Sequence, residues 1–280
     1  MSALLLKRPA LLRLAMRIDR LPGGLWLLLL ALALWPTAWW MGRRMVDGSD
    51  EPLGALAIAA LAALLWQHRG RLRASPHLGW LAMSLIGVLG SSAASGQLPP
   101  LLAALLGLLA LAAGIAAFLP RAVALAPVFG LALLSLPLLA SLQFYLGYPL
   151  RVLTAEASRW LLASHFVVER SGAALTVDGR LVLVDAPCSG VQMLWLGYFT
   201  ACVVALYGAR GNASFLARLP AVSALVLCGN VLRNSVLVAA EGTGQHLPGW
   251  AHDLVGLLVL AAVCSVIARV MWQPSGGRHV

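Results

Sequence analysis

Three residues in the second half of the sequence have side chains that can carry out chemistry, and each stands at or near the edge of an apolar segment. Cys188 lies in DAPCSG, Arg233 lies inside CGNVLRNSVLV, and His252 opens a further apolar run in GWAHDLVG. A thiol, a cation and an imidazole are the components of a cysteine acyl-transfer site, in which the thiolate attacks a carbonyl carbon and the imidazole moves protons.

Cys188 has the setting of a reactive cysteine. Pro187 favours extended backbone at Ala186, and Ser189 and Gly190 then open a predicted helix. A thiol at a helix amino terminus meets the positive end of the helix dipole, which favours the nucleophilic thiolate. The alternative is a small residue packed at a helix start. For the other cysteines, which lie well inside apolar runs, simple packing is the favoured interpretation: Cys202, Cys228 and Cys264.

Arg233 is flanked by apolar residues, at a predicted depth of about 10 Å below the membrane surface. An arginine at that depth is costly and marks a functional site or has a partner; the alternative is a side chain that snorkels to the surface. Asn230 lies three residues earlier on the same helical face, where its side chain is able to form a hydrogen bond with Arg233. A lone histidine such as His252 is often structural, and its neighbour Asp253 lies on another face of the helix.

The composition places these residues in a membrane protein. Of 280 residues, 61% are hydrophobic and 11% charged, and the mean hydropathy is +0.88; soluble domains carry about 25% charged residues. The formal net charge is +10, but the arginines flank apolar runs. They indicate membrane topology and contacts with lipid headgroups, and they argue against nucleic-acid binding.

The apolar runs predict an all-α polytopic membrane protein, a single integral membrane domain over residues 1–280 with about eight transmembrane helices. The candidate spans are 24–41, 53–67, 78–95, 100–119, 122–146, 190–207, 215–240 and 251–272.

The loop arginines set the predicted topology. The basic segment 1–23 is expected in the cytoplasm, followed by five helices in 24–146, an outer insertion at 147–189, three helices in 190–272 that carry the site, and a cytoplasmic tail at 273–280. In the outer loop 42–52, Arg43 and Arg44 oppose the positive-inside rule, by which basic residues are enriched in cytoplasmic loops. This topology follows from the loop arginines alone, independently of Cys188, Arg233 and His252. It nevertheless places all three residues at the outer, periplasmic boundary of the inner membrane.

The outer insertion has two predicted parts. Residues 149–165 have apolar side chains at helical spacing, which predicts an amphipathic helix on the outer surface. The following segment has β-branched runs punctuated by Ser171-Gly172 and Asp178-Gly179, which predicts a small β-hairpin before the sixth helix.

Three motifs in this order resemble the exosortase/archaeosortase family of membrane proteins: Cys188-Ser189-Gly190, then Asn230-Val231-Leu232-Arg233, then His252 with Gly256 four residues later. The motifs cover mainly residues 145–260, whereas the first five spans match in hydropathy alone. The Ala186-Pro187 pair before the cysteine differs from the single alanine expected there, which bears on the subfamily.

The resemblance implies a thiol protease or transpeptidase that cleaves a carboxy-terminal sorting signal of exported proteins, of the PEP-CTERM type, often beside exopolysaccharide production. Cys188 would attack and form a thioester, His252 would act as general acid and base, and Arg233 would stabilise the oxyanion or thiolate. Asn230 would orient Arg233, with Ser189 and Gly190 as supporting residues. The acyl acceptor would be water, a lipid or a glycan amine.

Three other function classes compete with this interpretation. A transporter or channel would bury ionisable residues near the midplane, which spans one to five do not offer. A non-catalytic scaffold for polysaccharide or protein export would make Cys188 incidental. Metal binding by His246, His252, Asp253 and Cys188 has no tight ligand spacing to support it, so no metal and no cofactor are expected.

Overall fold

The computed structural model describes residues 22–48, 50–183, 190–244 and 248–272. The predictions made for the basic segment, for Cys188, Ser189 and His246, and for the tail beyond residue 272 therefore lie outside the described residues. The chain folds into two compact units. The first comprises residues 1–43 and 59–123, and the second comprises residues 44–58 and 124–280.

The first unit is helical throughout most of its described residues. Its helices are α2 (Gly23–Ala33), most of α3 (Trp35–Val46), most of α4 (Leu53–His68), the short 3-10 turn η1 (Arg69–Arg71), α5 (Leu78–Ala94) and α6 (Pro100–Phe118). Small and hydroxyl residues let α5 and α6 approach closely: Ser84 Oγ donates to the carbonyl of Ala110, and Ser91 Oγ to that of Ala103. Close packing of small residues is the usual way in which helices associate in lipid.

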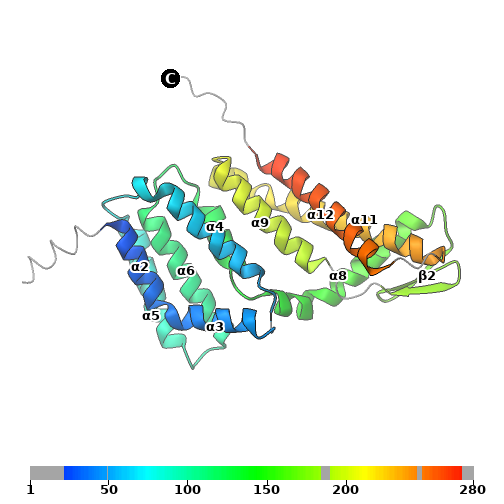
Figure 1. Cartoon of the computed structure of the whole chain (residues 1–280), viewed down its shortest axis with the longest axis horizontal. Coiled ribbons are helices and arrows are strands. Elements are labelled where there is room, and N and C mark those ends of the chain that lie inside the picture. Colours follow the sequence, from blue (N-terminus) through cyan, green and yellow to red (C-terminus); the bar gives the residue numbers. More distant parts are fainter. Residues whose placement is uncertain (1–21, 49, 184–189, 245–247, 273–280) are drawn as a thin grey trace, which may run out of the picture. The chain divides into compact units, whose positions relative to one another are not determined.

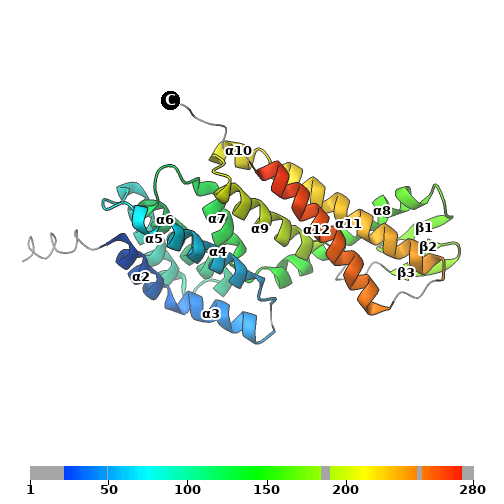
Figure 2. The same cartoon turned by 45° about the horizontal axis from the view of Figure 1, so that its top comes forward.

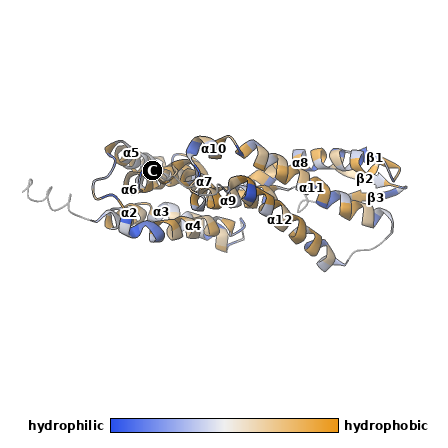
Figure 3. Cartoon of the chain, turned by 90° about the horizontal axis from the view of Figure 1, so that it is seen from above, coloured by the Kyte–Doolittle hydropathy of each residue, from blue (hydrophilic) through white to orange (hydrophobic). Residues whose placement is uncertain are grey.

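The second unit holds the candidate site. It contains α7 (Leu125–Leu134), α8 (Leu139–Leu162), α9 (Val191–Tyr207), α10 (Asn212–Leu216), α11 (Leu219–Gly242) and α12 (Gly249–Met271). Helices α9, α11 and α12 pack against one another, and Figures 1 and 2 show them side by side. Figure 3 shows hydrophobic colour along most of these helices, as expected for segments solvated by lipid.

The predicted fifth span, 122–146, is wrong as a single element. Helix α7 ends at Leu134, and α8 begins at Leu139 after a 91° bend. Pro137 stands in the break, where it cannot donate a backbone hydrogen bond. The buried carboxylate of Asp50 accepts from the amide nitrogen of Ala140 (3.3 Å) and so caps the start of α8.

Helix α8 includes most of the predicted amphipathic helix. Its buried positions include the small or polar residues Thr154, Ala155 and Ser158, whereas Leu153, Trp160 and Leu161 are exposed. Exposed apolar and aromatic side chains on one face are typical of a helix at a lipid interface.

The predicted hairpin is confirmed and gains a third strand. Strands β1 (Val168–Ser171), β2 (Ala174–Val177) and β3 (Arg180–Leu183) form an antiparallel sheet in chain order. The turn Asp178-Gly179 has positive φ at both residues, 47° and 82°, which is the backbone of a type I′ turn. Leu175 and Val177 of β2 are buried with Val238 of α11 and two residues of α8, so the sheet packs on both helices.

Among the described residues, three helical segments are long and apolar enough to cross a bilayer: α6, the α10–α11 segment Asn212–Gly242, and α12. The bent pairs α2–α3 and α7–α8 raise the number to five, while α5 and α9 are apolar but shorter. These segments support a helical membrane protein, but the expected eight spans are not confirmed. A helix of 17 residues such as α9 is about 25 Å long, less than the hydrocarbon thickness of about 30 Å.

Candidate active site

All the described residues predicted to form the site lie in the second unit. Gly190 comes directly before α9, Asn230 and Arg233 lie on α11, and His252 lies on α12. Cys188 and Ser189 are outside the described residues, and Cys188 precedes Gly190 by two positions in the sequence.

Gly190 and Asn230 form a close contact between the start of α9 and the middle of α11. Gly190 has φ +84°, and a Cβ placed there would lie 2.8 Å from Cγ of Asn230. Both the backbone conformation and the space therefore require glycine. Asn230 is 1% exposed, and its Nδ2 donates to Oγ1 of Thr154 on α8 (3.1 Å). Asn230 thus ties three helices together, while its expected hydrogen bond to Arg233 stays a prediction.

Arg233 lies against Gly256 of α12. A Cβ at residue 256 would lie 3.1 Å from Nε and 3.3 Å from Cζ of Arg233. The Nε atom is buried, so the root of the guanidinium is enclosed between the two helices. Arg233 is therefore packed against a neighbouring helix at the base of its guanidinium.

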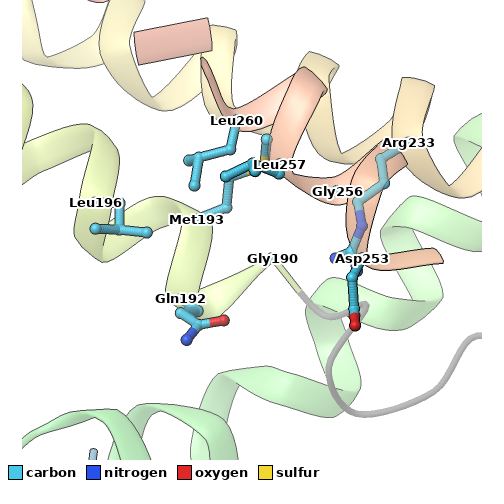
Figure 4. Close-up of a pocket in the computed structure, with 9 residues that line it drawn as sticks. All are labelled: Gly190, Gln192, Met193, Leu196, Arg233, Asp253, Gly256, Leu257 and Leu260. Carbon is cyan, nitrogen blue, oxygen red and sulfur yellow. The ribbon is translucent and has the colours of Figure 1, made fainter. Parts of the chain in front are cut away.

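A pocket of about 240 Å³ lies between α9, α11 and α12. Figure 4 shows Arg233, Gly256 and Asp253 on one side of it, Gln192 on the other, and Gly190 between them. The remaining wall is apolar and is formed by Met193, Leu196, Leu257 and Leu260. The pocket therefore combines a polar part, which holds the candidate cation, with a part that apolar groups can occupy.

His252 has a carboxylate partner that was not predicted from the sequence. Its Nε2 lies 3.0 Å from Oε1 of Glu241 at the end of α11. The signal was present in the sequence, because Glu241 follows Arg233 by eight residues and so lies two turns further along the same face. The carboxylate considered from the sequence was that of Asp253, which is adjacent to His252 and lines the pocket.

A second residue that was not predicted is Glu51, in the loop between α3 and α4. Nε2 of Gln192, in the first turn of α9, donates to Oε2 of Glu51 (2.7 Å). This bond links the polar part of the pocket to the loop that also carries Asp50, the cap of α8. No spacing in the sequence indicates this contact, because 141 residues separate the two side chains.

The geometry of the acidic, histidine and cysteine side chains bears on metal binding. Within the part of the chain that the structure describes, no group of three or more His, Cys, Asp or Glu side chains is arranged to hold a metal ion. The polar groups around the pocket can bind anions, donate hydrogen bonds and move protons.

Comparison with known proteins gives a family match. Residues 39–269, most of the chain, match a family model described as transmembrane exosortase. A search of curated proteins and a search of solved structures found no match.

Proposed function

Because this chain belongs to the transmembrane exosortase family, we propose that it is a membrane-embedded cysteine protease or transpeptidase. Cys188 is the nucleophile, His252 the general acid and base, and Arg233 the oxyanion donor. The substrates are exported proteins that end in a sorting signal with a transmembrane helix. Cleavage takes place at the periplasmic face of the inner membrane, in a chain that spans the membrane about eight times with both termini in the cytoplasm.

The observation that carries the proposal is the convergence of three helices on one pocket. Gly190, Arg233 and Gly256 come from the start of α9, from α11 and from α12, and all line it. Cys188 precedes Gly190 by two residues, and two peptide units reach at most about 7 Å between Cα atoms. This short link to a residue that lines the pocket supports the assignment of Cys188 as the nucleophile.

The proposed chemistry uses the three side chains in sequence. His252 accepts the thiol proton, and Sγ of Cys188 attacks the scissile carbonyl carbon, whose oxygen becomes an oxyanion that Arg233 stabilises. The C–N bond then breaks, the leaving amine takes the proton from His252, and a thioester remains on Cys188. Water, or an amine of a lipid or glycan, next attacks the thioester carbonyl carbon while His252 accepts its proton. The C–S bond then breaks, the acyl group leaves on the acceptor, and His252 returns the proton to Sγ of Cys188.

The composition of the pocket supports a substrate that crosses the membrane boundary. A helix inside lipid keeps its backbone hydrogen bonds and does not present a peptide bond for attack. A signal that unwinds just outside the hydrocarbon can place its reacting peptide beside Arg233 and Gln192. Its apolar side chains can then contact Met193, Leu196, Leu257 and Leu260.

The experiment is to follow an epitope-tagged exported protein that carries such a signal, of the PEP-CTERM type, in cells that express the full chain. Cys188→Ala is expected to abolish shortening of the reporter, and the acyl-enzyme of the unmodified chain is expected to be a hydroxylamine-sensitive adduct on Cys188. Cys228→Ala is the control, because Cys228 is an exposed thiol on α11. Normal shortening by Cys188→Ala would overturn the proposal and favour a non-catalytic scaffold or a transporter component of export.

A further inference from the structure

The contact between Glu241 and His252 joins two helices at the end of the α11–α12 pair. The two side chains are about one-third exposed, 36% and 32%. They lie on the seam that also holds Arg233 against Gly256: Arg233 and Glu241 are two turns apart on α11, while Gly256 and His252 are one turn apart on α12. His252 does not itself line the pocket, but it lies one helical turn, about 6 Å along the axis of α12, before Gly256, the residue against which the guanidinium packs.

We propose that Glu241 is a positioning residue for His252: its carboxylate holds the imidazole on the α11–α12 seam and stabilises the imidazolium that forms when His252 takes a proton. This inference rests on the proposed function, since it assigns a role through His252. It adds a carboxylate to the proposed cysteine and histidine, in the manner of a triad.

The atoms in contact determine the direction of proton transfer. In the neutral ring, Nε2–H donates to Oε1 of Glu241, so the lone pair is on Nδ1. Nδ1 is then the atom that accepts the thiol proton and later gives it to the leaving amine. Glu241 keeps its charge throughout and does not itself carry the proton.

Other charged groups near the imidazole do not replace Glu241. On its own helix, Asp253 is the next residue and lies on a different face. On α11, Arg233 is a cation and opposes imidazolium formation. Helix α9 carries no Asp, Glu, Lys or Arg between Val191 and Tyr207. On β3, which packs on α11, Arg180 lies against Gly244 and is also a cation. Among the described charged groups of α9, α11, α12 and β3, Glu241 is therefore the acceptor that favours the imidazolium.

The test measures alkylation of the Cys188 thiol by iodoacetamide in isolated membranes that contain the full chain, as a function of pH, with each cysteine read separately by mass spectrometry. An imidazolium beside the thiol raises the thiolate fraction near neutral pH. Glu241→Gln is expected to slow Cys188 alkylation at pH 7 at least about fivefold, the effect of losing one charge-assisted hydrogen bond. The acid limb of the pH profile of Cys188 alkylation is expected to move to lower pH in this variant. Glu241→Asp, which keeps the charge, is expected to recover part of the rate.

Two controls are built into the chain. Cys228 lies on the same helix as Glu241, and its alkylation rate is expected to be the same in all variants. Glu169→Gln makes the same substitution at an exposed position of β1 and is expected to leave the alkylation rate of Cys188 unchanged.

The outcomes separate this inference from the proposed function. If His252→Ala slows alkylation of Cys188 while Glu241→Gln does not, Glu241 has no positioning role and the proposed function stands. If Cys188 is alkylated as fast in the His252→Ala variant as in the unmodified chain, both the inference and the proposed function are overturned. The inference is also overturned if Glu241→Gln changes the alkylation rates of Cys188 and Cys228 in parallel, or if it slows alkylation of Cys188 without changing the pH profile. Either result would indicate a purely structural role for Glu241.

Discussion

Gly256 of α12 leaves the space in which the guanidinium of Arg233 lies: a Cβ at residue 256 would be 3.1 Å from Nε and 3.3 Å from both Cζ and Nη2. These separations are tighter than ordinary van der Waals contacts, so any side chain at this position moves the guanidinium.

Gly256→Ala is therefore expected to slow reporter processing about tenfold, because small displacements of a catalytic group are costly. Alanine raises intrinsic helix stability by about 1 kcal/mol relative to glycine, so the loss is not expected to come from unfolding. The measurement is the rate of reporter shortening at equal membrane abundance. Gly249→Ala is the matched control on the same helix, since a Cβ there meets nothing within 4 Å. Equal rates for the two variants would show that the position of the guanidinium does not matter.

Arg233→Lys separates charge from shape. Lysine also has a long stem and a positive head, but it cannot reproduce the planar fork of guanidinium donors. We expect the variant to insert normally and to process the reporter at least about a hundred times more slowly, since loss of one oxyanion donor costs about 3–4 kcal/mol. Immunoblots of the reporter measure the rate of processing, and immunoblots of the variant itself measure its abundance in the membrane. Near-normal processing would make Arg233 a topology anchor and leave Cys188 and His252 as a dyad.

The sidedness of the site can be measured on the four cysteines in intact cells. A membrane-impermeant maleimide is expected to label Cys188 far more readily than Cys202, which is buried, or Cys228 and Cys264. Cys228 is exposed on α11, so a lipid-soluble maleimide is expected to label it while the impermeant reagent does not. Labelling of Cys188 only after the inner membrane is permeabilised would contradict the periplasmic placement.

Arg210 is a stability site at the opposite end of α12. It is 3% exposed and donates to the carbonyl oxygens of Val270, Met271 and Trp272, which at a helix end have no partner within the helix itself. Burial lowers the pKa of Arg210, and the charge of Arg218 adds to this effect. The side chain stays charged, because an arginine pKa lies far above neutral pH.

Arg210→Met is expected to lower the free energy of unfolding by about 2–4 kcal/mol, since three carbonyls at the end of α12 lose charge-assisted partners. Thermal unfolding in detergent measures the effect. Arg43→Met is the control, because Arg43 is exposed on α3. An unchanged midpoint for Arg210→Met would mean that water or lipid headgroups replace the guanidinium at no cost.

Local sequence signals were sufficient to identify most elements. Apolar runs predicted α5, α6, α9, α11 and α12 to within a few residues, because a helix in lipid needs a continuous apolar stretch. Turn residues predicted the hairpin, since Asp178-Gly179 supplies the positive φ values that its turn requires. The break between α7 and α8 was missed because hydropathy is averaged along the chain and does not register a bend at Pro137.

The sequence by itself also determined which chemical groups are available to the candidate site. They are a cysteine before a helix, an arginine and an asparagine inside one apolar run, and a histidine at the start of another. Only the tertiary structure decided their partners. Glu241 meets His252, Gly256 meets Arg233, and Thr154 meets Asn230 because α8, α11 and α12 pack at particular registers. Those registers depend on side-chain shapes along whole helix surfaces, and no local pattern in the chain encodes them.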